Sequence, residues 1–153
     1  MNPVHAALMQ GGVENIREHE QGFLSGELPV HRVGLVRCMA ATEGRSAQVQ
    51  LQFMPVGLSE MAANAARTCL EVVRAQVKGT GFCSGLDIER GVIWIGAAGG
   101  LQEVTPVVRV ALAIAPDLFR KLNALCTSEV LAETYVTMQA QAVSGQAVPT
   151  PTS

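Results

Sequence analysis

The chain has 153 residues, of which 48% are hydrophobic and 16% are charged, and its formal net charge is -2 at pH 7. This length suits one compact domain. The chain has no run of basic residues and no cluster of aromatic residues, which argues against a nucleic-acid surface, because such surfaces need positive charge or stacking platforms.

The low charge is the most informative property of the composition. Ordinary soluble proteins contain roughly 25% charged residues, so a monomer with 16% leaves much of its exterior uncharged. Either Gln, Thr, Ser and Ala cover that exterior, or part of it is buried against copies of the chain or against another protein. We favour burial in an interface, and we expect no membrane and no nucleic acid among the partners.

The sequence also predicts the compartment. The first residues, MNPVHAALMQGG, lack the basic segment and the long apolar run of a secretory signal. The uncharged stretch 134–153 is too polar to span a bilayer. The four cysteines are Cys38, Cys69, Cys83 and Cys126. They form no CxxC pair and have no zinc-ligand spacing, so we expect reduced thiols in a cytoplasmic protein.

The first half of the chain is predicted to form a leader and a hairpin. Residues 1–28 have weak patterning and suggest a peripheral leader with a short helix at Val13 to His19. Strand-like patterning follows from Val30 to Thr42. After the turn-like EGRS, three glutamines alternate with three apolar residues, as in a half-buried antiparallel strand: Gln48, Gln50 and Gln52 with Val49, Leu51 and Phe53.

The segment from Leu58 to Gly79 has the clearest helical pattern. Ser59 is placed to cap its start and Gly79 to close it. Apolar residues recur at spacings of four and three, which predicts one buried face: Ala62, Ala66, Cys69, Val73 and Val77. A row of charged residues with the same periodicity predicts a solvated face: Arg67, Glu71, Arg74 and Lys78.

The second half is rich in glycine and then in valine. GTGFCSG predicts a loop, LDIERGVIWIGA a strand through Trp94, and GAAGG a wide hairpin turn. TPVVRVALAIA predicts a further strand. A last helix is expected to begin at Pro116, with a kink or restart near Thr127, and residues 141–153 have the composition of a tail.

The predicted order is therefore β-β-α-β-β-α. It favours an α+β fold: a two-layer sandwich in which two helices cover an antiparallel sheet of about four strands. The predicted organisation is a leader at 1–28, one domain at 29–140, and a flexible or partner-ordered tail at 141–153.

Cys83 is the candidate nucleophile, because it lies between glycines where a thiol can be exposed. A cysteine nucleophile needs a base, and the three histidines, His5, His19 and His31, all lie in the first 31 residues. In the catalytic alternative, His31 is the residue expected to act as the base. We favour the other interpretation, in which Cys83 has a structural role. Ser84 lacks the GxSxG context of a serine hydrolase.

Other ligand sites have weaker signals. Gly96, Gly99 and Gly100 are the candidates for binding an anion through backbone N-H groups, but they match no phosphate-loop motif and are predicted to precede a strand. His5, Glu18 and His19 have no metal-ligand spacing, and Asp87 with Glu89 fits a solvated strand edge. We expect no metal and no cofactor.

Two residues are predicted to lie in an interface. One is Trp94, the only tryptophan of the chain. The other is Arg109, which interrupts an apolar run and therefore needs a partner or an exit to water. The favoured function is a non-enzymatic assembly or interaction protein that forms a homo-oligomer or coats a larger complex, for example a virion or mobile-element accessory protein. The alternative is a small cytosolic enzyme or ligand-binding domain that uses the Cys83 loop and the Gly96–Gly100 turn.

Overall fold

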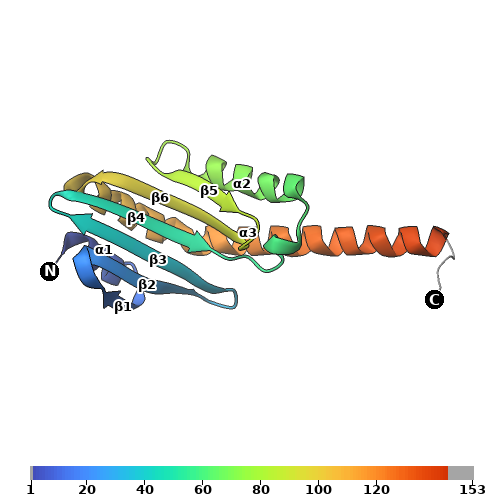
Figure 1. Cartoon of the computed structure of the whole chain (residues 1–153), viewed down its shortest axis with the longest axis horizontal. Coiled ribbons are helices and arrows are strands. Elements are labelled where there is room, and N and C mark those ends of the chain that lie inside the picture. Colours follow the sequence, from blue (N-terminus) through green and yellow to red (C-terminus); the bar gives the residue numbers. More distant parts are fainter. Residues whose placement is uncertain (1, 145–153) are drawn as a thin grey trace.

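A computed structural model describes residues 2–144, which form a six-stranded antiparallel sheet with helices packed on one of its faces (Figure 1). The elements in chain order are α1 (Pro3–Gln10), β1 (Glu14–Glu18), a 3-10 turn (Glu20–Gly22), β2 (Phe23–Val30), β3 (Gly34–Glu43), β4 (Ser46–Phe53), a 3-10 turn (Leu58–Glu60), α2 (Ala63–Val77), β5 (Cys83–Asp87), β6 (Val92–Gly100) and α3 (Leu101–Ser144).

The strand order in the sheet is β1-β2-β3-β4-β6-β5. Successive strands pair as hairpins, except that α2 carries the chain from the end of β4 to the outer strand β5, and β6 then returns beside β4. The long helix α3 packs on β4 and β6, with α1 and α2 beside it. The predicted α+β class with an antiparallel sheet is confirmed, but the sheet has six strands rather than about four, and three α-helices rather than two occur in residues 2–144.

Three strands are not predicted by the sequence, β1 and β2 from the first 30 residues and β5 from the glycine-rich segment, whereas the strand predicted at 105–115 is helical. The expected helix at Val13 to His19 is wrong, because this segment is β1, which pairs with β2. Asn15 has φ of 55°, and the register of β1 shifts between Glu14 and Arg17. This irregularity hides the strand's alternation in the sequence. Residues 1–28 also contain α1, whose Val4 and Ala7 are fully buried.

The hairpin of β3 and β4 is confirmed. Glu43 pairs with Ser46 across a two-residue turn in which Gly44 has φ of 59°, as tight hairpin turns require. The predicted alternation along β4 is also confirmed: Val49, Leu51 and Phe53 are buried, whereas the three glutamines between them are half-buried or exposed on the other face.

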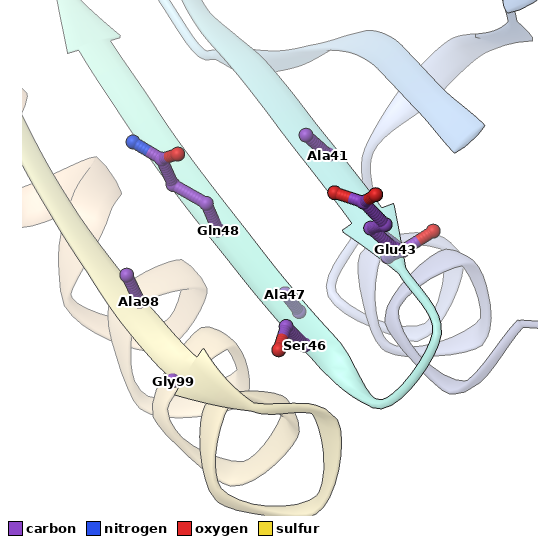
Figure 2. A pocket seen from close by; sticks show the side chains of 8 residues that line it. Ala41, Glu43, Ser46, Ala47, Gln48, Ala98 and Gly99 are labelled. Carbon is purple, nitrogen blue, oxygen red and sulfur yellow. The ribbon is translucent and has the colours of Figure 1, made fainter. Parts of the chain in front are cut away.

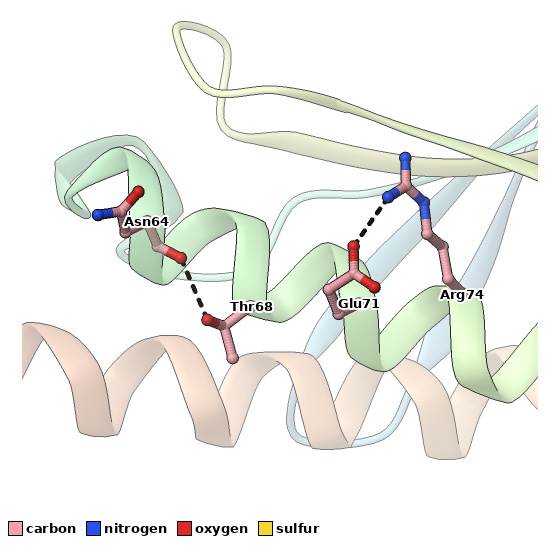
Figure 3. A network of polar contacts seen from close by, with 4 residues as sticks. All are labelled: Asn64, Thr68, Glu71 and Arg74. Carbon is pink, nitrogen blue, oxygen red and sulfur yellow. Dashed lines mark hydrogen bonds and ion pairs between the residues drawn. The ribbon is translucent and has the colours of Figure 1, made fainter.

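Helix α2 confirms most of the predicted pattern. Ala66, Cys69, Val73 and Val77 are buried against the core, although Ala62 is exposed. The charged row lies in solvent, where Arg74 pairs with Glu71 at 2.8 Å; Figure 3 shows this pair and the bond from Thr68 to the Asn64 carbonyl. Gly79 follows the helix with φ of 78°, as a closing glycine does.

Ser59 is not the cap of α2. It lies in the preceding 3-10 turn, and the N-cap residue is Ala62, which makes no side-chain capping bond. The helix therefore begins three residues later than the sequence predicts.

The largest correction concerns residues 101–144. The valine-rich segment 105–115 is not a strand but part of α3, and Pro116 lies inside this helix rather than at its start. Val104, Val108, Ala111 and Ala115 recur at helical spacing and are buried. The helix runs through Thr127 without a restart and extends past the sheet (Figure 1). Within the predicted tail 141–153, residues 145–153 lie outside the described part.

The glycine-rich segment also differs from its prediction. Cys83 begins strand β5 rather than lying in a loop, and GAAGG is the end of strand β6 rather than a hairpin turn. The turn of this hairpin lies earlier, where Gly91 has φ of 67° between β5 and β6.

Candidate functional site

The helices leave one face of the sheet uncovered, and we call it the open face. It consists of the alternate residues of β2 to β6 that point away from the helices. The cross-strand rows of this face follow from the strand register. The middle row contains Ser25, Met39, Gln50, Gly96 and Cys83.

The centre of the open face carries no charge. Strands β4 and β6 contain no ionisable side chain along their whole length, SAQVQLQF and VIWIGAAGG. Gln52 donates a hydrogen bond to the Oε1 of Gln50 at 2.6 Å, so the two amides are aligned along the strand. Ionisable residues of this face lie on the flanking strands, for example Arg37 and Glu43 on β3. An uncharged centre with a charged margin is the usual anatomy of a protein interface.

One row near an end of the open face carries large side chains, and we call it the ridge. The ridge contains Glu27, Arg37, Gln52, Trp94 and Gly85. Arg37 is exposed, whereas Trp94 is partly buried because its indole lies against the Gly85 backbone. A Cβ at position 85 would overlap the indole ring. The absence of a side chain at Gly85 therefore allows the indole of Trp94, from β6, to lie on β5.

The other end of the open face is sunken, and we call it the hollow. Its row contains Phe23, Ala41, Gln48 and Ala98. Figure 2 shows Ala41, Gln48 and Ala98 on neighbouring strands, with Glu43 at the end of β3. The hollow has a volume of about 730 Å³, and a smaller depression of about 170 Å³ adjoins it at Phe23 and Met39. Alanine side chains are too short to fill this space.

The structure does not bring the two residues of the catalytic alternative together. Cys83 is exposed on the open face at the start of β5, whereas His31 lies in the turn between β2 and β3. Strands β6 and β4 lie between β5 and β3, a separation of about 14 Å at three strand spacings. His19 bonds instead to Ser25, with 2.8 Å between Nε2 and Oγ.

The glycines of the anion-binding alternative have structural explanations. A Cβ on Gly96 would lie 2.9 Å from the carbonyl oxygen of Val49 on the neighbouring strand. Contrary to the prediction, Gly99 and Gly100 lead into a helix rather than a strand. However, the carboxylate of Glu103 lies beside both glycines. This carboxylate already interacts with the positive helix end and repels an anionic ligand.

The remaining cysteines are in the interior. Burial raises the pKa of Cys38 from 9.0 to about 12, and the Sγ atoms of Cys69 and Cys126 are 3.7 Å apart between α2 and α3. Among the residues that the structure describes, no three His, Cys, Asp or Glu side chains gather as metal ligands would.

The two residues predicted for an interface lie on different layers. Trp94 is on the open face of the sheet, whereas Arg109 is exposed on helix α3. The charge of Arg109 is therefore solvated, although its sequence neighbours are apolar. The sequence did not single out Met39, Ala41 or Ala98, because their shared surface depends on strand pairing.

Comparisons with known proteins do not assign the chain to a family. No protein-family model matches it, and no match is found among curated proteins. Within the described residues, no helix combines the length and apolarity that crossing a membrane requires.

Proposed function

We propose that the protein is a non-enzymatic assembly protein that self-associates through the open face of its sheet. The observation that carries this proposal is the uncharged centre of that face, formed by two strands without an ionisable residue. A sheet with one covered face leaves the other to solvent or to a partner. A face intended for solvent normally alternates its apolar residues with charged ones, which β4 and β6 lack.

The exposed apolar groups support the same proposal. Leu35 on β3 is 46% exposed, and Met54, just after β4, is 38% exposed. Leu35 lies two residues before Arg37 on β3 and continues the open face beyond the ridge, and Met54 follows the end of β4 at the same end of the sheet. Together with Trp94 and Met39 they enlarge the apolar part of a surface that is otherwise formed by glutamine and alanine. Such a surface is typical of interaction sites.

Light scattering across micromolar concentrations tests this proposal. We expect a mass at least twice the 16.1 kDa of the chain, falling toward 16.1 kDa on dilution. A mass of one chain at every concentration would contradict self-association. Whether the assembly coats a larger structure, such as a virion, is a separate proposal, which recovery of the protein within such a particle would test.

A further inference from the structure

We infer that two copies of the chain pack with their open faces together, so that the ridge of each copy enters the hollow of the other. This inference rests on the proposed function and specifies its partner and geometry. The two-fold axis runs across the strands, along the middle row. Each β4 then lies antiparallel to the β4 of the second copy.

The shape of the open face is the first argument. A half turn about the middle row exchanges the two ends of the face. It places Trp94 of one copy opposite Ala98 of the other, and Arg37 opposite Ala41, because these pairs lie on the same strands at equal distances from the axis. Large side chains thus meet small ones. The hollow of about 730 Å³, which is lined by β3, β4 and β6, has the capacity of a small-molecule site. It therefore has room for the guanidinium group of Arg37, whereas the Trp94 indole lies over β5 at the margin of the hollow.

One pair of opposite charges agrees with the same axis. When Arg37 lies opposite Ala41, the next residue of β3 on this face is Glu43, about 7 Å further along the strand. The arginine side chain is long enough to reach that carboxylate. Within one chain these two residues are six positions apart on β3, or about 20 Å, so only a second copy can pair them.

The central amides are also self-complementary. Gln50 lies on the axis, opposite Gln50 of the second copy. Gln48 lies opposite Gln52 of the second copy. Each carboxamide has both donors and an acceptor. These side chains can therefore satisfy one another in an interface that excludes water.

The area of the open face is close to what a specific dimer needs. The open face spans β2, β3, β4, β6 and β5, which is about 19 Å across, and about 26 Å along β3. The product of these dimensions is roughly 500 Å² per copy, or roughly 1,000 Å² for two copies. This area treats the face as flat and leaves out the additional surface of its side chains. This value lies at the lower limit for specific interfaces.

Cross-linking provides the first test. Gln50→Cys in a Cys83→Ser background should form covalent dimers with a short bis-maleimide, since packed sheets lie about 10 Å apart. Ala113→Cys in the same Cys83→Ser background, on the exposed side of α3, is the matched control and should remain uncross-linked. A dimeric mass by light scattering without cross-linking of Gln50→Cys would overturn this geometry and leave the proposed function standing.

Charge reversal provides the second test. Arg37→Glu and Glu43→Arg should each weaken the dimer by about tenfold or more, and the double variant should restore most of the affinity, because the pair is formed between copies. Dimers that are unaffected by either variant, or not rescued by the double variant, would overturn the inference. A monomeric mass for the natural chain would overturn both this inference and the proposed function, even if another protein binds the open face.

Discussion

The indole of Trp94 lies against the backbone of Gly85 on the neighbouring strand, so that any side chain at position 85 would overlap the ring. The two residues are register partners in the hairpin of β5 and β6. This pairing fixes Trp94, the only tryptophan of the chain, in the ridge of the open face. It also gives the ridge an intrinsic spectroscopic probe.

Gly85→Ala should displace the indole and destabilise the fold by about 1–3 kcal/mol, the usual cost of overpacking. The tryptophan emission should shift to longer wavelength as the ring becomes more exposed. Urea unfolding and fluorescence measure the two effects. Gly100→Ala is the control, since its Cβ would meet Glu103 at an ordinary 3.6 Å. Equal results for both variants would show that Trp94 does not depend on Gly85.

Ala66→Asp should destabilise the protein by about 3 kcal/mol or more, because it buries a carboxylate without a partner. Ala66 is fully buried on the core side of α2. Arg67→Ala, on the exposed side of the same helix, should change the free energy of unfolding by less than about 0.5 kcal/mol. Thermal or urea unfolding measures both. Small and equal losses would mean that the packed face of α2 is assigned wrongly.

Cys38 should make stability fall in alkaline solution. Its pKa is raised by burial to about 12 in the folded protein, against 9.0 for an ordinary thiol. The unfolded chain therefore loses the proton first, and ionisation favours unfolding between pH 9 and 12. The free energy of unfolding should decrease by up to about 1.4 kcal/mol per pH unit in this range, with no effect below pH 9.

Urea unfolding of the natural protein and of Cys38→Ala at pH 8 and pH 10.5 isolates this effect from other titrating groups. Between pH 8 and pH 10.5, the free energy of unfolding should decrease more in the natural protein than in Cys38→Ala. A difference that is the same at both pH values would contradict the assignment to Cys38.

Cys83 should be the thiol that iodoacetamide modifies in the folded protein, because it is exposed whereas Cys38, Cys69 and Cys126 are buried. Its position in the middle row also predicts that labelling slows as protein concentration rises and dimers form. Mass spectrometry of each site measures the rates. Selective, rapid labelling of Cys83 that persists at pH 6 would instead indicate an activated nucleophile and favour the enzyme alternative.

Sequence patterns predict those elements whose packing is local. The alternation of β4 and the apolar stripe of α2 are both visible, because each element buries one face against the core. The start of α3 is predicted to be a strand because valine favours strands, although the spacing of Val104, Val108 and Ala115 is helical. Strand β1 escaped detection since its bulge at Asn15 breaks the period of two.

The sequence predicts the polar side of β4 but not the open face as a whole. The row of Gln48, Gln50 and Gln52 indicates a polar side of β4, and the low charge indicates an interface. However, neither property shows which face the helices cover. The hollow beside Ala41 and Ala98 depends on the crossover that places β6 next to β4, and such long-range pairing has no local signature.

A charge at the centre of the open face tests most directly whether that face forms the assembly. Met39→Lys places an ammonium group in the middle row, whereas Ala113→Lys places the same group on the exposed side of α3. Light scattering of the two variants at matched micromolar concentrations should show monomers for Met39→Lys and the natural assembly for Ala113→Lys. A natural assembly in Met39→Lys, with the variant folded as judged by circular dichroism, would contradict self-association through the open face.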